Sequence, residues 1–506
     1  MAIAEKIAQP DRYRSEPSVW TALRTPKLLS REILAGVVVA LALIPEAISF
    51  SIIAGVDPRV GLFSSFVMAT SIAFLGGRPA MITAATGAVA LVIAPVVRDH
   101  GMNYLIATVI LGGVFQIILA LLGVAKMMRF IPRSVMIGFV NALAILIFTA
   151  QVPNLIGVPW LVYPLVAAGI IIMVVMPHIT KAVPAPLVAI MLITATVVVT
   201  AINVPTVGDE GALPTSLPEL LLPNIPISWN TLTIIAPYAI AMAFVGLLES
   251  LMTAKLVDEI TNSHSNKSRE SWAQGTANIL SGLFGGMGGC AMIGQTMINV
   301  KSAGARTRIS TFVAGVFLLI LVVALGDLVA IIPMAALVAV MIMVSFATFD
   351  WHSIRLATLK RMPVGETIVM MATVIVVIIT HNLAVGVIFG VIVAMVIFAR
   401  RVAHFASVEK TFDLDPAEPT VTYTVRGELF FASSNDLTTQ FDYSTDPNKI
   451  IINLSGSHIW DASTVAALDS ITTKYEKYGK SVTIVGMNEA STRLHKRLAG
   501  NLSAGH

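Results

Sequence analysis

Long apolar runs separated by short polar segments fill the chain from about residue 33 to residue 402. Each run is long enough to cross the ~30 Å hydrocarbon core of a bilayer, which takes about 20 helical residues. The runs predict fourteen transmembrane spans, near residues 33–55, 60–76, 80–98, 104–124, 134–152, 160–177, 184–203, 231–254, 273–287, 289–300, 308–326, 328–349, 364–381 and 383–400. The third and tenth runs are shorter and are interrupted by Gly and Thr. Twelve spans with two re-entrant segments remain the alternative.

The pattern changes after Ser407 to that of a soluble α/β domain, with alternating or continuously apolar strands. Strands are predicted at 421–425, 449–454 and 481–486. A helix is predicted from Val465 to Tyr478, and the preceding residues Asp461-Ala462-Ser463-Thr464 can cap it. Alternation of strands and helices is typical of a small α/β unit. The predicted domains are therefore a polar N-terminal segment (1–32), a membrane domain (33–403) and a soluble domain (407–506).

Composition supports a membrane protein and excludes several other classes. Hydrophobic residues make up 56% of the chain and charged residues 12%, whereas soluble domains carry about 25% charged residues. The net charge of +4 comes without a basic stripe, so a nucleic-acid partner is not expected. The single cysteine excludes a disulfide framework. No motif supplies a nucleophile with its base or a set of metal ligands, so we expect no enzyme, cofactor or metal.

Basic residues gather in one set of the loops between the predicted spans. With the N-terminus placed inside, the inside loops hold Arg78, Lys126, Arg129, Arg133, His178, Lys181, Lys255, Lys267, Arg269, Lys301, Arg306, Arg308, Arg355, Lys360, Arg361, Arg400 and Arg401. The long outside segment 204–230 carries only acidic charges. Membrane proteins keep Lys and Arg in cytoplasmic loops. The sequence therefore predicts a multi-pass protein of the cytoplasmic (inner) membrane with both chain ends in the cytoplasm.

Two carboxylates fall inside predicted spans. Glu46 follows Pro45 in the first span, and Glu249 lies in the eighth. A carboxylate at bilayer depth is costly, so it normally faces a cavity, a partner or a proton path. Pro45 also interrupts the helical hydrogen bonds beside Glu46 and leaves backbone carbonyls free. The alternative for both residues is a protonated side chain that only bonds a neighbouring helix.

The two short spans have the character of half-helices. Ala80-Met81-Ile82 begins one and Ala291-Met292-Ile293 the other, seven spans apart. Paired short, Gly-interrupted segments in two halves indicate an inverted repeat with a binding site between them. Helix N-termini carry free N–H groups and partial positive charge, so two facing ends could bind an anion without a fixed charge. Ordinary packing of small residues between membrane helices is the alternative.

Several motifs, in order along the chain, resemble one family. Pro45-Glu46-Ala47-Ile48-Ser49-Phe50, followed by Ala54-Gly55, Pro58 and Gly61-Leu62, is similar to the first-helix signature of the SulP family of inorganic anion transporters (sulfate permeases). Further matches are Phe130 to Val135 with Gly138-Phe139; Asn266, Glu270, Gln274-Gly275 and Asn278; Ile298-Asn299; and Gly304 to Thr307. Arg426 to Ser433 looks like the first strand of the family's STAS domain. The resemblance covers about residues 20–500.

The resemblance implies an all-α, uracil-permease-like fold of two inverted seven-helix repeats, followed by a cytoplasmic STAS domain. Spans 1–4 and 8–11 would form a mobile core and spans 5–7 and 12–14 a gate, with transport by an elevator movement and a homodimer as the assembly. The implied substrate-binding residues are Glu46, Phe50, Thr86, Gly87, Ala291, Met292 and Ile293. The implied coupling-ion residues are Glu249 and Thr253.

The chain departs from the family pattern at two places. Many members have an arginine in span 10 where this chain has Gln295, so the field that holds the anion must come from helix ends. Sodium-coupled bicarbonate members have Asp where this chain has Glu249, and a hydroxyl near the position of Ile293. Both positions weaken a sodium site, and we expect proton-coupled symport.

The expected activity is secondary active transport of a small inorganic or carboxylate anion, such as sulfate or bicarbonate. An anion channel or exchanger, and a sodium-coupled bicarbonate symporter, are the alternatives of the same fold. In the STAS domain, Ala462 stands where related regulatory domains carry a phosphorylatable serine. Ser463 is interpreted as a helix-capping residue.

Overall fold

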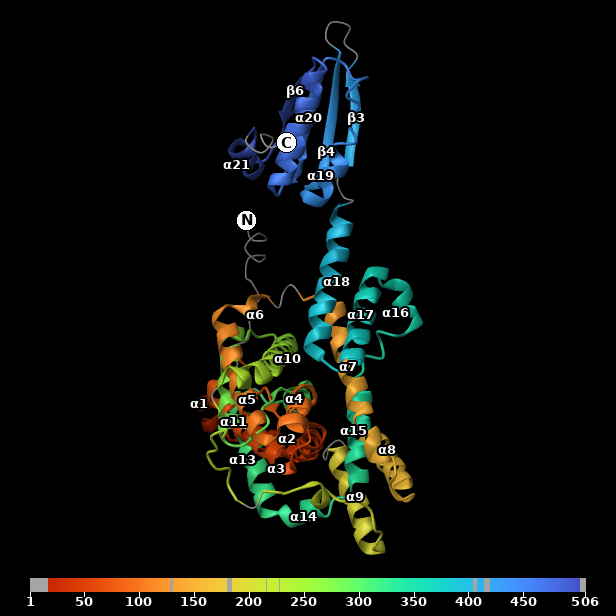
Figure 1. The fold of residues 1–506 in the computed structure, drawn as a ribbon. Coiled ribbons are helices and arrows are strands. Elements are labelled where there is room, and N and C mark those ends of the chain that lie inside the picture. Colours follow the sequence, from red (N-terminus) through yellow and green to blue (C-terminus); the bar gives the residue numbers. More distant parts are fainter. Residues whose placement is uncertain are drawn as a thin grey trace, which may run out of the picture. The chain divides into compact units, whose positions relative to one another are not determined.

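The computed structural model describes residues 17–127, 131–179, 184–214, 216–226, 228–403, 407–413 and 419–500 (Figure 1). Arg129, Phe130 and Lys181 lie outside the described residues. The chain divides into two compact units, Met1–Val391 and Ile392–His506. Each unit is described by itself.

The first unit is helical apart from two very short strands. Its elements are α1 (Val19–Arg24), α2 (Pro26–Ala54), α3 (Pro58–Leu75), β1 (Thr83–Ala84), α4 (Gly87–His100), α5 (Met102–Leu121), α6 (Val124–Met127), α7 (Arg133–Thr149), α8 (Val162–Ile179), α9 (Ala185–Thr200), α10 (Trp229–Thr261), α11 (Lys267–Leu283), β2 (Cys290–Ala291), α12 (Ile293–Met297), α13 (Arg308–Ala324), α14 (Gly326–Ala330), α15 (Met334–Thr348), α16 (Leu356–Arg361), α17 (Val364–Thr380) and α18 (Leu383–Ala403). Among the described residues, seven helices are long and apolar enough to cross a membrane, and four apolar helices are shorter.

Eight of the fourteen predicted spans coincide with a helix to within three residues, and six differ. The first and ninth begin earlier than predicted, because α2 starts at Pro26 and α11 at Lys267, so that α11 includes Lys267 and Arg269, which were assigned to a loop. The twelfth, 328–349, is divided between α14 and α15. The third predicted span, 80–98, begins as extended chain and becomes helical only at Gly87. The tenth consists of α12 and a π-helical turn, Ile298–Ser302. The eighth is longer than predicted, because α10 continues to Thr261 and therefore includes Lys255, which was assigned to a loop.

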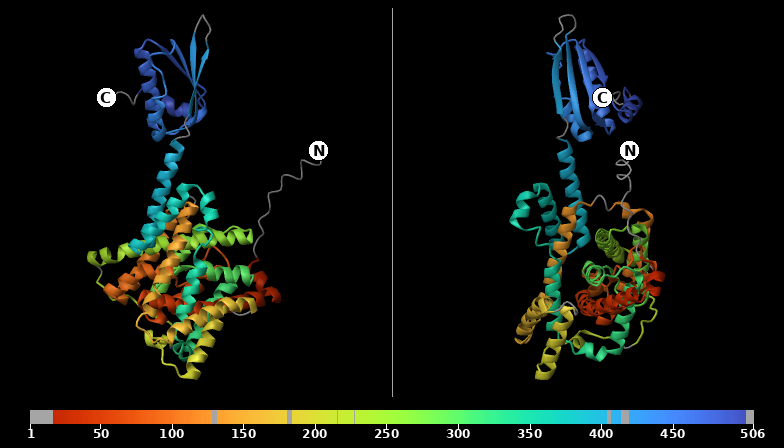
Figure 2. Two further views of the ribbon diagram at one scale, coloured as in Figure 1. Left: turned by 90° about the vertical axis from the view of Figure 1, so that its right-hand side faces the viewer. Right: turned by 180° about the vertical axis from the view of Figure 1, so that it is seen from behind.

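The helices of the first unit pack in two groups (Figures 1 and 2). In one group α2, α3 and α13 pack together, and α5 packs against α10 and α11. In the other group α7 packs against α15 and α17, and α8 against α9 and α15. Fewer contacts join the groups, among them those of α4 with α7 and α2 with α15. This division makes the boundary between the groups the place to look for a substrate cavity.

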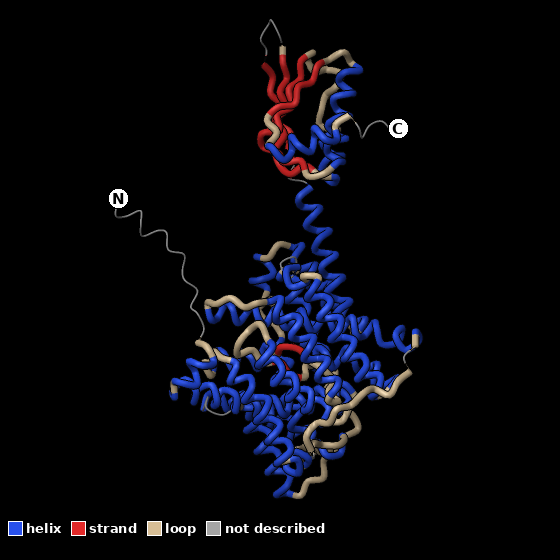
Figure 3. The backbone as a smooth tube through the Cα atoms, turned by 90° about the vertical axis from the view of Figure 1, so that its left-hand side faces the viewer, coloured by secondary structure: helices blue, strands red, loops and turns tan. Residues whose placement is uncertain are grey.

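Strands β1 and β2 pair antiparallel among the helices of the first unit (Figure 3). Thr83 lies opposite Ala291 and Ala84 opposite Cys290. The pairing requires glycine at position 289, since a Cβ there would lie 1.9 Å from the carbonyl oxygen of Ala84. A single strand pair thus holds both short segments side by side, although more than 200 residues separate them in sequence.

The sequence echo that suggested a repeat does not mark equivalent positions. Ala80-Met81-Ile82 lies in the turn before β1, whereas Ala291 ends β2 and Ile293 is the first residue of α12. By their place before a helix, Thr86 and Met292 correspond, because each is an N-cap residue. The correspondence therefore rests on the strand-then-helix arrangement rather than on the shared tripeptide.

Arg78 is buried rather than exposed in a loop. Its side chain is 2% exposed, and its Nη1 lies 3.2 Å from Oδ1 of Asp258 at the end of α10. The backbone N–H groups of Gly77 and Arg78 donate to Oε2 of Glu270 at 2.6 and 3.0 Å. Removing one partner of a buried ion pair leaves an uncompensated charge, so these contacts fix the segment that leads into β1.

The second unit begins within α18, at Ile392, and continues as a four-stranded sheet with helices. Its elements are β3 (Ser407–Asp413), β4 (Thr420–Leu429), α19 (Phe431–Leu437), β5 (Lys449–Ile459), α20 (Ala462–Lys477), β6 (Ser481–Val485) and α21 (Glu489–Leu498). The strand order is β3-β4-β5-β6; β3 and β4 are antiparallel, and the other pairs are parallel. The three strands and the helix expected from the sequence are present, and β3 was missed. Of the segment Arg426 to Ser433, expected as a first strand, Arg426 to Leu429 lie in the second strand of this sheet, and Phe431 to Ser433 lie in α19.

One residue at the start of α20 does not have the role that was expected from the sequence. Asp461 is the N-cap, and its side chain accepts the N–H of Thr464. Ser463 is the second helical residue and is exposed, so it is not the capping residue.

The carboxylate of Asp446 is buried in the second unit and binds several side chains around it. Asp446 accepts hydrogen bonds from the hydroxyls of Tyr423 and Tyr475 at 2.6 and 2.5 Å, and its Oδ1 lies 2.6 Å from Nζ of Lys410. Burial alone would raise the pKa of Asp446, but the bonds from Lys410 and the two tyrosines outweigh it and hold that pKa below its ordinary value. The resulting stabilisation is present above the pKa of an unfolded aspartate and is lost as pH falls through the folded value.

Candidate functional site

A cavity of about 340 Å³ lies at the boundary between the two helix groups of the first unit. Eight residues expected at the site line it: Glu46, Phe50, Thr86, Gly87, Glu249, Met292, Ile293 and Gln295. The opposite wall comes from α7 and α15 and includes Phe139, Leu143, Ile147, Val344 and Thr348. Its volume is at the lower end of the range for small-molecule sites, so it is suited to a small solute.

Two expected residues do not line the cavity. Ala291 belongs to β2, where its N–H donates to Oγ of Ser250 at 3.0 Å. Thr253 is fully buried, and its hydroxyl donates to the backbone carbonyls of Glu249 at 2.8 Å and Ala291 at 3.3 Å. Both residues lie directly behind the cavity wall and hold β2 against α10.

The N-terminus of α4 forms part of the wall. Thr86 is its N-cap, with the side chain accepting the N–H of Val89 at 3.4 Å, and Gly87 is its first residue. The first N–H groups of a helix have no partner within it, and they carry partial positive charge. The residue at position 87 must be small, because a Cβ there would lie 2.8 Å from Cε1 of Phe50. Gly87 itself lines the cavity, so the start of α4 borders it.

The start of α12 lies on the same cavity. Met292 is its N-cap and makes no side-chain capping bond. Ile293, Gly294 and Gln295 all line the cavity. The structure thus brings two helix starts to one cavity, as the sequence pattern predicted.

Among the described residues that line the cavity, the charged groups are two carboxyl groups, Glu46 and Glu249, and there is no Lys or Arg. Nε2 of Gln295 donates to Oε1 of Glu46 at 2.7 Å. The side chain that replaces the family's arginine is therefore bound to the carboxyl group of α2 rather than directed only at the cavity. Burying an unpaired negative charge is costly, so an anion here is favoured when a carboxyl group carries a proton.

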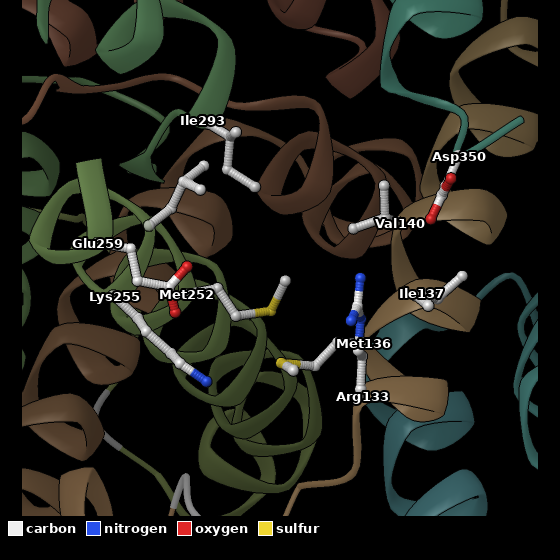
Figure 4. Close-up of a pocket in the computed structure, with 10 residues that line it drawn as sticks. Arg133, Met136, Ile137, Val140, Met252, Lys255, Glu259, Ile293 and Asp350 are labelled. Atoms are coloured by element: carbon white, nitrogen blue, oxygen red, sulfur yellow. The ribbon is translucent and has the colours of Figure 1, made fainter. Parts of the chain in front are cut away.

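A second space adjoins the cavity at Val140 and Ile293, which line both (Figure 4). We call it the vestibule; it measures about 440 Å³. Figure 4 shows Lys255 and Glu259 of α10 on one side and Arg133 and Asp350 on the other. Lys255 and Glu259 belong to the last two turns of α10. The vestibule therefore adjoins the cavity on the side of the C-terminal end of α10.

The sequence interpretation missed Cys290 and the apolar wall. Sγ of Cys290 donates to Oε2 of Glu249 at 2.9 Å and lies 3.1 Å from Oγ1 of Thr86. One indication of a role for Cys290 was available in the sequence, because position 290 directly precedes the expected site residue Ala291. Phe139 was noted only as part of the motif Gly138-Phe139, without a role at the site. Ile147 gave no signal, because an apolar residue on a membrane helix is expected wherever it faces.

Two family models match the chain. The model described as the sulfate permease family matches residues 29–162 and 160–373, which is more than half of the chain. The model of the STAS domain matches residues 412–500.

Curated relatives match over most of their length. YbaR of Bacillus subtilis, whose name assigns it provisionally to sulfate transport, is 51% identical over 471 residues, which cover 93% of this chain and 97% of that protein. The bicarbonate transporter BicA of Picosynechococcus is 27% identical over 428 residues, covering 78% of this chain and 74% of that protein.

Two solved structures share the fold. The transmembrane domain of a cyanobacterial bicarbonate transporter, BicA, has a TM-score of 0.63 at 24% identity and covers 72% of this chain and 97% of its own. The murine anion transporter Slc26a9, in its inward-facing state, has a TM-score of 0.79 at 15% identity and covers 98% and 93%.

Proposed function

The chain belongs to the sulfate permease family, and we propose that it transports a small anion, of the class of sulfate or bicarbonate, through the cavity between its two helix groups. The family consists of membrane transporters rather than enzymes, and the C-terminal domain is a STAS domain. The observation that carries the proposal is the meeting of two helix starts, at Gly87 and Ile293, on one cavity. Free N–H groups at helix starts bind anions without a fixed positive charge.

We propose that transport occurs by an elevator movement. The two helix starts and both carboxyl groups belong to the helix group that contains α2, α4, α10 and α12, whereas Phe139 and Leu143 belong to the other. Movement of the first group against the apolar wall of the second would carry the whole polar half of the site. The fourteen spans, the inverted repeat and the homodimer implied by the resemblance are part of this proposal.

We propose a proton as the coupling ion, with Glu249 as its carrier. Among the described residues, no group of three or more His, Cys, Asp or Glu could hold a metal ion. The hydroxyl of Thr253 is directed at backbone carbonyls, and the carboxyl group of Glu249 accepts from Cys290. A sodium ion would therefore find few oxygens here, while a carboxyl group in a cavity without cations readily holds a proton.

Uptake into proteoliposomes tests the function. We expect an inward proton gradient to accelerate sulfate or bicarbonate uptake about tenfold, in line with ordinary coupling free energies, and a sodium gradient to leave it unchanged. Saturable uptake would support a transporter. Uncoupled, electrogenic and unsaturable flux would instead favour the channel, and acceleration by sodium alone would favour the sodium-coupled symporter.

The topology gives a separate prediction, with both chain ends in the cytoplasm. Leu222 lies in the acidic segment predicted to be outside and is 74% exposed. Leu222→Cys should react with a membrane-impermeant maleimide from outside in intact cells, against a low background because Cys290 is buried. Lys360→Cys in α16 is the matched control and should react only after permeabilisation. The reverse pattern would rule out this topology.

A further inference from the structure

Three side chains from three elements form a hydrogen-bonded chain behind the cavity. Sγ of Cys290, on β2, donates to Oε2 of Glu249, on α10, at 2.9 Å. The same Sγ lies 3.1 Å from Oγ1 of Thr86, the N-cap of α4, and either atom could be the donor. Cys290 is fully buried, whereas Glu249 and Thr86 line the cavity. The thiol therefore connects the carboxyl group to the hydroxyl without intervening water.

The number of hydrogens on each group determines which group donates in each of these hydrogen bonds. A thiol has one hydrogen, a hydroxyl has one, and an ionised carboxylate has none. When Glu249 is ionised, Cys290 donates its hydrogen to the carboxylate, so the contact at 3.1 Å requires the hydroxyl of Thr86 to donate to sulfur. The hydrogen of Thr86 is then donated to sulfur and is not available to a ligand, which disfavours an anion.

We propose that Cys290 is a positioning residue that couples protonation of Glu249 to anion binding at Thr86. When Oε2 of Glu249 takes up a proton from water, the new carboxyl O–H group keeps that proton and donates a hydrogen bond to sulfur, and the S–H group turns to donate to Oγ1 of Thr86. The hydroxyl of Thr86 then has its own hydrogen free to donate to an anion in the cavity. One proton enters, each hydrogen already present stays on its own atom, and the two hydrogen bonds of Cys290 reverse direction. The inference rests on the proposed proton coupling and supplies its physical link.

The hydrogen bonds through Cys290 are the direct connection between Glu249 and Thr86, because the other ionisable groups nearby lie elsewhere. The other ionisable group that lines the cavity is Glu46 on α2, which accepts from Gln295. The vestibule beyond Ile293 is bordered by Arg133, Lys255, Glu259 and Asp350. The described parts of α4, α5, α7, α11 and α15 place no ionisable side chain on the cavity wall. Low-dielectric surroundings strengthen hydrogen bonds and their mutual polarisation.

The infrared S–H band tests the reversal without any ligand, because the chain has a single cysteine. In purified full-length protein, the band should shift to higher frequency when the carbonyl band of a protonated Glu249 appears as pH is lowered, since a hydroxyl is a weaker acceptor than a carboxylate. Glu249→Gln should hold the band at its low-pH position at every pH. A band that stays fixed while Glu249 titrates would overturn the relay alone. If Glu249 does not titrate, the proposed proton coupling fails with it.

A second test measures sulfate affinity by calorimetry at mildly acidic and mildly alkaline pH. Thr86→Val should weaken binding about tenfold in acid, the size of one charge-assisted hydrogen bond, and much less in alkali. In a Cys290→Ala background the loss should be the same at both pH values, because the hydroxyl is no longer held by sulfur. Cys290→Ser, which can donate and accept, should restore the pH dependence. A loss that depends on pH equally with and without Cys290 would refute the role of the thiol.

Discussion

Replacing Gly87 by valine is expected to abolish anion binding. A Cβ at this position would lie 2.8 Å from Cε1 of Phe50 and 3.2 Å from Cδ1 of Ile147, and the two methyl groups of valine would extend beyond it over the first turn of α4. They would cover the N–H groups that we propose as the anion's donors. Each hydrogen bond to a charged group is worth about 1.5–3 kcal/mol, so losing one weakens binding about tenfold to a hundredfold. Calorimetry with sulfate on the purified protein measures the change.

The matched control is Gly326→Val. Gly326 is also the first residue of a helix, α14, but it does not line the cavity. A Cβ there would be 3.5 Å from the carbonyl oxygen of Pro214, an ordinary contact. This variant should bind sulfate as the wild type does. Thermal unfolding should show both variants folded; a folded Gly87→Val protein with unchanged affinity would place the anion site elsewhere.

The apolar runs predicted the helices well because membrane spans are decided locally. In hydrocarbon each backbone group needs a partner within its own segment, so a long apolar run such as 104–124 becomes one helix, α5. The third run, 80–98, does not follow this rule over its whole length. Thr83 and Ala84 find their partners in β2 instead, and a pairing across more than 200 residues leaves no periodic signal in either segment.

Site residues could be predicted where the residue type itself is unusual in a membrane. They could not be predicted where only their position in the fold gives them a role. Glu46 and Glu249 were identified from the cost of a carboxylate in a membrane, and both line the cavity. Cys290 drew no attention, since a lone buried cysteine usually behaves as a small apolar residue. Its importance comes from the strand that places its sulfur between Thr86 and Glu249.

Glu249→Gln is expected to separate anion binding from proton coupling. Glutamine keeps the shape of a protonated glutamic acid, and its amide can still donate to Sγ of Cys290, but it cannot release a proton. The variant should bind sulfate about as tightly as the wild type at acidic pH and keep that affinity in alkali. It should also exchange external for internal anion, because the neutral site can cross the boundary between the helix groups in either direction.

What the variant should lose is acceleration by a proton gradient. In the wild type, a bound anion and a proton on Glu249 favour each other, and this reciprocal linkage is what symport requires. An empty, ionised Glu249 is costly to move past the apolar wall formed by Phe139 and Leu143, which prevents leak. In the variant the carrier returns empty at no such cost, so the roughly tenfold acceleration expected of the wild type should vanish.

The control is Glu366→Gln in the first turn of α17, an exposed carboxylate outside the cavity, which should keep full coupling. Proteoliposomes with an inward proton gradient and labelled sulfate compare the three proteins directly. If Glu249→Gln still accumulates sulfate as the wild type does, the coupling proton is carried elsewhere. Glu46 is then the carboxyl group to test, because it lines the same cavity and its bond to Gln295 gives it a partner that could sense its charge in the same way.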